Sequence, residues 1–366
     1  MDSFTQKLEK APFAFNFDDL LLLPGFSEVR SKDISLKTMF SKSITISSPL
    51  VSSPMDTVTE SAMAIAMAEN GGIGVIHRNM SAEEQVEILK TVKSAEPNSP
   101  NATIGDDKRL AVAAALSPFD IDRAKLISKY TDALLFDVAH FHTKAILESV
   151  KKIISETGKD IIIGSMGTKE DVMHSVSYLE KVDGLRVGIG GGSICITTDV
   201  TKAGSPTPFA VSQAADALRE LGLEIPIIAD GGIRTAGDIA LVFALGADSA
   251  MLGYGVAGTD ESPGDIKTVN GAKYKPYRGM GSKGAREKRL VNDRYADTGG
   301  KNFDEGIEGM IPYKGSVADV ISVMNSSVKA SIGYAGAGSI NDMHAKARIA
   351  RISSGRTSKA EIKPGR

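Results

Sequence analysis

Eight short apolar runs, each ending in small or polar residues, alternate with helical stretches along this chain. The runs cover 49–54, 72–77, 110–115, 133–137, 160–164, 184–188, 226–230 and 249–253. Continuous apolar strands are typical of parallel sheets that are buried on both faces. Eight alternations within roughly 200 residues favour an α/β fold of the (β/α)₈ TIM-barrel type, with a doubly wound open sheet as the alternative.

Helical segments with recognisable starts lie between these runs. Ser81-Ala82-Glu83-Glu84 matches a capping box, and Thr235-Ala236-Gly237-Asp238 has a similar character. The stretches 119–130, 143–156 and 210–221 carry apolar residues at three-to-four spacing, which indicates amphipathic helices. Functional residues of such a barrel gather at the carboxyl ends of its strands, so we expect the polar and glycine residues there to converge around one mouth.

Composition excludes some classes of partner. The 43 Lys and Arg residues against 45 Asp and Glu give a net charge of −2, which argues against a nucleic-acid binder. No apolar run reaches membrane-spanning length, and the first residues lack the apolar core of a signal peptide, so a reducing cytoplasm is favoured for this single-cysteine chain. His140 and His142 stand two apart, and we interpret them as a solvated loop pair without a metal.

The only cysteine, Cys195, lies in the glycine-rich stretch 188–197, directly after the sixth run. Glycine lets the backbone approach a ligand closely and leaves N–H groups able to face an anion. A thiol in such a loop suggests a nucleophile that faces a phosphorylated substrate. The alternative is a small buried hydrophobic side chain, as most free cysteines are, and the loop by itself leaves both interpretations open.

The seventh and eighth runs end in a second group of candidate residues. Asp230 can accept hydrogen bonds from both hydroxyls of a ribose, and Gly231-Gly232 expose N–H groups near a helix start, where an anion is stabilised. Gly253-Tyr254 completes the usual phosphate position of a barrel. Asp137, at the end of the fourth run, is another candidate ribose acceptor. Either aspartate could instead simply cap the helix that follows it.

The segment 270–316 follows the eighth run and differs from the rest of the chain. It is rich in Gly, Lys and Arg and poor in apolar periodicity, so we expect an irregular segment that forms a lid, a binding loop or a disordered stretch. Arg294-Tyr295 and Glu305 lie in this segment, and composition alone assigns them no function. We expect residues 1–366 to form one barrel domain, with a basic tail from 353 that is poorly ordered.

Seven blocks of sequence together match a known family. In chain order they are 17–24 (FDDLLLLP), 52–60 (SSPMDTVTE), 70–77 (NGGIGVIH), 192–197 (GSICIT), 229–233 (ADGGI), 277–282 (YRGMGS) and 333–338 (GYAGAG). A single block would not be specific, but seven blocks in family order are. The chain resembles the family of inosine-5′-monophosphate dehydrogenase and guanosine-5′-monophosphate reductase over most of its length.

The resemblance implies a homotetrameric barrel enzyme that oxidises inosine monophosphate (IMP) to xanthosine monophosphate (XMP) with NAD⁺. Cys195 would attack C2 of the purine, hydride would leave to NAD⁺, and water would hydrolyse the covalent thioimidate. A mobile flap would deliver Arg294 and Tyr295 to activate that water, while Thr197 and Glu305 would belong to a second proton route.

The same resemblance implies a set of binding residues. The nucleotide would contact Ser53, Met55, Arg186, Ser193, Asp230, Gly232, Gly253, Tyr254, Tyr277, Gly279, Met280 and Gly281. Asp137 would meet the nicotinamide ribose of NAD. The backbone carbonyls of Gly190, Gly192 and Cys195 would bind a monovalent cation, normally K⁺, whose other ligands come from a neighbouring subunit.

The sequence departs from the family pattern at two places. Only the stretch near 94–107 stands where dehydrogenases usually carry a regulatory pair of CBS modules, and Gly164-Ser165 replaces the usual Gly-Asn. The main alternative is the reductase, which converts GMP to IMP and ammonia with NADPH and normally lacks those modules. Arg294-Tyr295 favours the dehydrogenase, because only hydrolysis needs a water-activating pair. A catalytically idle nucleotide-binding regulator is a third hypothesis, which the presence of Cys195 and Thr197 disfavours.

Overall fold

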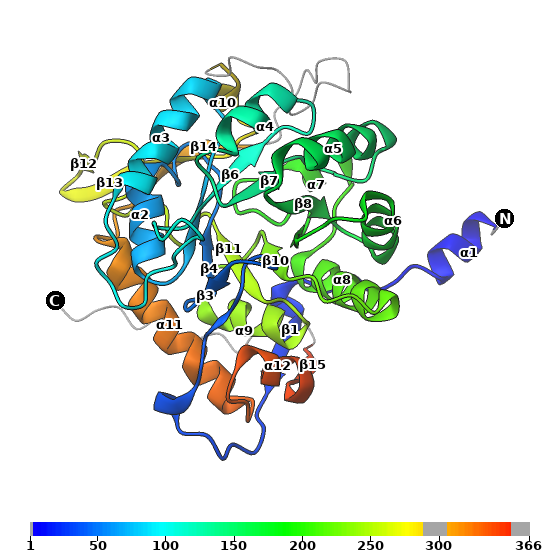
Figure 1. The fold of residues 1–366 in the computed structure, drawn as a ribbon. Coiled ribbons are helices and arrows are strands. Elements are labelled where there is room, and N and C mark those ends of the chain that lie inside the picture. The colour runs from blue at the N-terminus through cyan, green and yellow to red at the C-terminus, as the bar shows by residue number, and fades with distance from the viewer. Residues whose placement is uncertain (1–2, 288–305, 353–366) are drawn as a thin grey trace.

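Eight parallel strands close into a barrel at the centre of the computed structural model, which describes residues 3–287 and 306–352 (Figure 1). The strands are β4 Leu50–Ser52, β5 Ile73–Ile76, β6 Val112–Leu116, β7 Ala133–Phe136, β8 Asp160–Met166, β9 Gly184–Val187, β10 Ile227–Asp230 and β11 Ser249–Leu252. Each strand pairs with the next along the chain, and β11 pairs with β4, where Met251 lies opposite Val51. The predicted TIM barrel and its eight strands are confirmed.

Helices pack around the outside of this barrel. They are α2 Ser61–Glu69, α3 Ala82–Ser94, α4 Ile121–Ile127, α5 Lys144–Thr157, α6 Lys169–Leu179, α8 Thr207–Leu221, α9 Ala236–Ala244 and α11 Val317–Tyr334. Capping boxes begin α3 at Ser81 and α9 at Thr235, as the sequence predicts. Helix α11 contacts both α9 and α2 and so completes the ring. Within 3–287 and 306–352, no helix has both the length and the apolar character needed to cross a bilayer.

Burial on both sides explains why the strands are apolar throughout. Val51 and Leu135 belong to a fully buried cluster that fills the barrel. Leu50 and Leu134, their immediate neighbours, belong to a second cluster between the barrel and its helices. Successive side chains of a strand point to opposite faces, so a strand that is covered on both faces needs apolar residues at every position.

A short hairpin closes the amino-terminal end of the barrel. Strands β2 Thr38–Met39 and β3 Thr45–Ile46 pair antiparallel, and Phe40 between them is fully buried in the interior cluster. The N–H of Lys42 donates to the carbonyl of Asp183, at the start of β9, at 2.9 Å. The opposite end, where the strands finish, therefore remains for a functional site.

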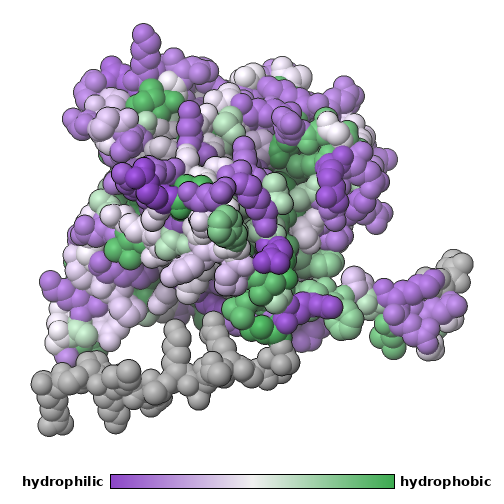
Figure 2. All heavy atoms as spheres, turned by 90° about the horizontal axis from the view of Figure 1, so that it is seen from below, coloured by the Kyte–Doolittle hydropathy of each residue, from purple (hydrophilic) through white to green (hydrophobic). Residues whose placement is uncertain are grey.

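Two strands from near the two ends of the described chain pair outside the barrel. Strand β1 Leu20–Leu23 pairs antiparallel with β15 Arg348–Arg351. The other short elements of these two parts of the chain are η1 Phe17–Asp19, η2 Ser31–Asp33, which contacts α11, and α12 Ile340–Lys346, which contacts α9. Before them, α1 Phe4–Glu9 projects away from the body of the molecule (Figures 1 and 2), and its Phe4 and Leu8 are exposed.

The segment after β11 is more regular than its composition predicts. A three-stranded antiparallel sheet forms from β12 Lys267–Val269, β13 Ala272–Arg278 and β14 Glu308–Pro312, and α10 Lys283–Glu287 follows β13. Lys275 and Tyr277 of β13 are buried while their neighbours are more exposed. This period of two places one face of the strand against the protein, a pattern that the abundant Gly, Lys and Arg residues conceal.

Candidate active site

A cavity of about 440 Å³ opens at the carboxyl ends of the barrel strands, a size that suits a small organic ligand. Its walls are the loops that follow the strands. The lining residues include Ser53 after β4, Asp137 after β7, 188–195 after β9, 230–234 after β10, 253–254 after β11 and 279–281 after β13. The strand ends thus converge around one mouth, as expected of a barrel.

The cavity collects every predicted site residue within the described ranges. From the nucleotide set it has Ser53, Met55, Arg186, Ser193, Asp230, Gly232, Gly253, Tyr254, Tyr277, Gly279, Met280 and Gly281. From the catalytic, cofactor and cation sets it has Cys195, Thr197, Asp137, Gly190 and Gly192. Arg294, Tyr295 and Glu305 lie outside the described residues. The individual roles of all these residues stay predictions.

Cys195 lies between β9 and the short helix α7 Thr197–Thr201. Its N–H donates to the carbonyl of Gly192 at 3.0 Å, which turns the loop back on itself. Its Sγ donates to Oγ1 of Thr197 at 3.2 Å. The thiol is half-buried and lines the cavity. It is therefore not the fully buried apolar cysteine of the alternative interpretation, and a ligand in the cavity can reach it.

The cysteine loop is joined to the residues around β14. The N–H of Ile307 donates to the carbonyl of Ile194 at 3.0 Å, and the N–H of Gly279 donates to the carbonyl of Ile307 at 2.9 Å. Cys195 and Gly306 form an isolated antiparallel bridge. The loop of the thiol and the loop 279–281 are thus connected through the residues that directly follow 288–305.

Close backbone approach explains the glycines on this side of the cavity. Gly188 has a φ of +126°, and a Cβ there would lie 2.1 Å from the carbonyl oxygen of Asp230. Gly232 has a φ of +73°, a conformation that other residues rarely adopt. The hydroxyl of Thr207, on α8, lies 2.8 Å from the carbonyl oxygens of both Asp230 and Gly231. The loops after β9 and β10 therefore pack backbone against backbone.

A buried charge cluster underlies the cavity. Arg186 on β9 lies 2.8 Å from Oδ1 of Asp137 through Nη1, and 2.8 and 2.7 Å from Oδ2 of Asp230 through Nε and Nη2. Burial lowers the pKa of Arg186, but the two carboxylates outweigh burial and raise it above its usual value. Asp230 is thus oriented by Arg186, while Thr235 caps the following helix, so the capping alternative for Asp230 is wrong.

Tyr277, on β13, brings a hydroxyl to the wall of the cavity. It hydrogen-bonds with Ser193 and with the backbone of Tyr254, and burial raises its pKa to about 12. A Cβ on Gly253 would lie 2.9 Å from the Tyr277 hydroxyl oxygen, so that oxygen lies against the backbone of the loop after β11. The hydroxyl stays protonated at neutral pH and can donate to an anion.

A second buried ion pair holds the loop that carries Met280. Arg278 contacts Asp56 through Nε at 3.0 Å and through Nη2 at 2.5 Å, and Nδ2 of Asn79 donates to the same carboxylate at 2.8 Å. Burial raises the pKa of Asp56, but the hydrogen bonds from Arg278 and Asn79 outweigh burial, and the pKa ends below its usual value. The carboxylate remains charged and links β13 to the loop after β4.

Several lining residues were missed by the sequence reasoning. Asn16 and Asp18 come from the segment before β1, and Arg234, whose Nη2 lies 2.8 Å from Oδ1 of Asp18, follows the loop after β10. The sequence did contain a signal for Asp18 and Arg234, because Asp18 lies within the family block 17–24 and Arg234 directly follows the block 229–233. Ser165 also lines the cavity, at the position that departs from the family pattern.

A (β/α)₈ barrel with a thiol that lines a cavity at the carboxyl ends of its strands has the architecture of a barrel enzyme. The chain belongs to the IMP dehydrogenase / GMP reductase family, whose domain model matches residues 14–363. Among its relatives, inosine-5′-monophosphate dehydrogenase of Korarchaeum cryptofilum is 37% identical over 95% of this chain and 96% of the relative. Inosine-5′-monophosphate dehydrogenase of Cryptosporidium parvum is 38% identical over 92% of this chain and 91% of the relative. That of Borreliella burgdorferi is 39% identical over 93% of this chain and 94% of the relative.

The lengths of these alignments differ. The alignment with the Korarchaeum relative has 458 positions, more than the 366 residues of this chain, whereas that with the Cryptosporidium relative has 370. The archaeal relative therefore contains residues that have no counterpart here.

Proposed function

We propose that this chain oxidises IMP to XMP with NAD⁺ through a covalent intermediate on Cys195. One observation carries the proposal: the half-buried thiol and the glycine loops after β10 and β11 line the same cavity. A nucleotide whose phosphate binds those loops presents its base to the rest of the cavity, where Cys195 lies. The three relatives above are named for this dehydrogenase activity.

Each part of the nucleotide has a chemically suited wall. Hydroxyls and backbone N–H groups suit the phosphate, and they come from Ser53, Ser193, Gly232, Gly253, Tyr254 and Tyr277. The Asp230 carboxylate, oriented by Arg186, accepts hydrogen bonds from the ribose hydroxyls. Met55, Gly279, Met280 and Gly281 surround the base.

NAD is the second group that the family implies, and the residues present fit it. Asp137 lines the cavity beside Val138 and Ala139, so a carboxylate that suits a ribose stands next to small apolar side chains. Asp137 is itself held by Arg186. When bound there, NAD⁺ accepts the hydride that leaves C2 of the purine.

The thiolate of Cys195 forms the bond to C2, and loss of hydride from that carbon leaves a thioimidate. Thr197, whose Oγ1 lies 3.2 Å from Sγ, accepts the thiol's hydrogen bond and stands at the start of a proton route. Water then adds to C2, the S–C2 bond breaks, and Cys195 recovers its proton. In total, IMP, NAD⁺ and water give XMP, NADH and a proton. Arg294, Tyr295 and Glu305 are assigned to the activation of this water.

We assign a K⁺ site to the carbonyls of Gly190, Gly192 and Cys195. Backbone carbonyl oxygens are the ligands that K⁺ prefers, and the tight turn from Gly192 to Cys195 brings peptide groups of this loop together. Three carbonyls are too few for K⁺, which accords with a homotetramer in which a neighbour supplies the rest. A cytoplasmic location would keep the Cys195 thiol reduced.

We also propose one catalytic domain over 1–366, with the segment 270–316 as its flap. The short stretch near 94–107 would replace the CBS modules of other dehydrogenases. The long alignment with the archaeal relative supports this assignment, because that relative has additional residues.

The direct test compares two reactions. The protein with IMP, NAD⁺ and K⁺ should form NADH, whereas GMP with NADPH should give no loss of NADPH; both are followed by absorbance of the reduced nicotinamide. Omission of IMP is the control. Loss of NADPH with GMP and no NADH from IMP would establish the reductase instead. Nucleotide binding with neither reaction would establish the idle regulator.

Arg294→Ala should slow hydrolysis of the intermediate more than hydride transfer. In a rapid-mixing experiment, NADH should then form in a burst of one equivalent per site, followed by a much slower steady rate. Arg289→Ala, a second arginine of the same segment, is the matched control and should keep the wild-type profile. Equal slowing of both steps would contradict the assigned role of Arg294.

A further inference from the structure

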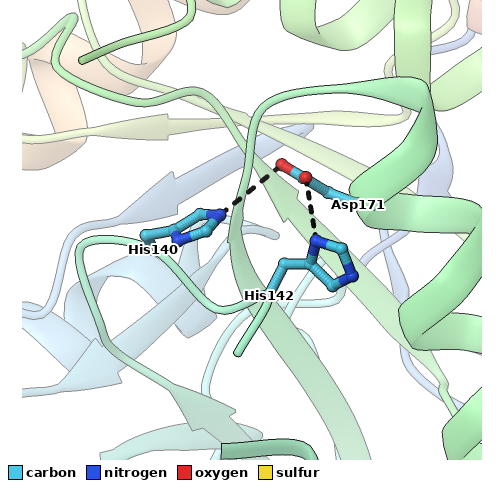
Figure 3. Close-up of side chains that lie close together, drawn as sticks. All are labelled: His140, His142 and Asp171. Carbon is cyan, nitrogen blue, oxygen red and sulfur yellow. Dashed lines mark ion pairs between the residues drawn. The ribbon is translucent and has the colours of Figure 1, made fainter. Parts of the chain in front are cut away.

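Four polar side chains form a cluster just outside the wall of the cavity. His140 and His142 lie on the loop between β7 and α5, and Asp171 and His174 lie in the first two turns of α6. Figure 3 shows both imidazoles facing the Asp171 carboxylate from the neighbouring loop. Nδ1 of His142 lies 3.2 Å from Oδ1 of Asp171, and Nε2 of His140 lies 3.9 Å from Oδ2.

The cluster differs from the solvated loop pair that the sequence predicts. Asp171 has 12% of its side chain exposed and His142 has 21%, while His140 is half exposed. The Asp171 carboxylate reaches the histidines from α6, about thirty residues further along the chain. The sequence of the histidine loop alone does not reveal this contact. His142 thus sits in a partly buried polar site.

We propose that His140, His142 and Asp171 bind a divalent transition-metal ion of the zinc type. One ligand atom from each lies within 4.8 Å of the other two. Zn²⁺ holds imidazole nitrogen and carboxylate oxygen at roughly 2.0–2.2 Å, so its ligand atoms stand about 3–4 Å apart. The ligand atoms of His142 and Asp171 already have this separation. The His140 imidazole is exposed, and rotation of its side chain would bring its nitrogen to the same distance from the other two ligand atoms.

The surroundings orient these ligands. The N–H of Gly167 donates to Oδ2 of Asp171 at 3.2 Å, which fixes the carboxylate at the start of α6. Nε2 of His142 lies 2.6 Å from Nδ1 of His174. With the ion on Nδ1 of His142, the Nε2–H donates to His174. An outer partner of this kind sets the tautomer and the ring orientation of a histidine ligand.

Three protein ligands leave a coordination position for solvent or for a further ligand. The loop that carries His140 also carries Asp137, Val138 and Ala139 of the cavity wall. A bound ion would therefore hold that wall against α6. The proposed metal site does not depend on the proposed reaction, since metal binding is measured without substrate.

The test is a calorimetric titration of tag-free protein with Zn²⁺, with Co²⁺ as a second probe whose visible absorption reports the ligand geometry. We expect one saturable ion per chain. The double variant His140→Ala/His142→Ala should lose it, and Asp171→Asn, which keeps an oxygen for the Gly167 N–H, should weaken it at least tenfold. His174→Ala should weaken it by roughly 10–100-fold, as loss of an outer partner does.

His344→Gln is the matched control, since His344 lies on α12, away from the cluster, and should bind as the wild type does. Thermal unfolding of each variant without metal checks that the fold is kept. Wild-type affinity in the double variant, an equal loss in the control, or no saturable binding to the wild type would each overturn the proposal.

Discussion

Replacement of Cys195 by alanine should lower kcat by at least roughly a thousandfold while IMP still binds. No other described side chain of the cavity offers a sulfur nucleophile, because the chain contains only one cysteine. The variant should keep its fold, since the thiol is half-buried and, within the described residues, its side chain hydrogen-bonds only with Thr197. Binding of IMP should survive because Asp230 and the glycine loops are untouched.

Two measurements separate binding from chemistry in this variant. NADH formation gives kcat, and calorimetry gives the IMP affinity, since the chain has no tryptophan for a fluorescence titration. Val200→Ala changes an exposed residue of the same short helix and should leave both values near those of the wild type. Turnover within tenfold of the wild type in Cys195→Ala would rule out the covalent route.

Of the substitutions proposed here, Arg186→Met should lower the free energy of unfolding the most. It leaves Asp137 and Asp230, with 2% and 16% of their side chains exposed, without their shared cation. Removal of one partner from a buried ion pair typically costs about 3–5 kcal/mol, because the other charge stays buried. The orientation of Asp230 is lost as well, so KM for IMP should rise together with the fall in stability.

Chemical denaturation and steady-state kinetics check both parts of this prediction. Arg219→Met is the matched control: Arg219 is exposed and its partner Asp216 half exposed, and such surface pairs contribute roughly 0–1 kcal/mol. In the double variant Arg186→Met/Asp137→Asn one of the two facing charges is gone, and part of the stability should return. A single variant as stable as the wild type would show that Asp137 and Asp230 do not rely on Arg186.

The barrel could be predicted because its signal is local. Runs such as 133–137 and 226–230 are apolar at every position before their final aspartate, as a strand covered on both faces requires. The capping residues Ser81 and Thr235 mark helix starts directly. The strand ends then indicate where the site lies, and the structure places the described candidates around one cavity there.

The features that escaped prediction depend on contacts between distant segments. Arg186 stands 49 residues from Asp137 and 44 from Asp230, and within its own run it is only a polar interruption. Asp171 likewise contacts His142 only when α6 packs beside the loop between β7 and α5. Local sequence patterns contain neither pairing, because both depend on how neighbouring strand–helix units of the barrel pack.

The pairing of β1 with β15 has a consequence for how the protein is made. Asn16 and Asp18, which help to line the cavity, lead into β1, and the N–H of Ile352 donates to the carbonyl of Asp19 at 2.9 Å. These early residues leave the ribosome first, yet their strand partner is translated among the last of the described residues. A nascent chain therefore carries all the barrel strands before it carries the strand that pairs with β1, and the wall that Asn16 and Asp18 give to the cavity is anchored only late in synthesis.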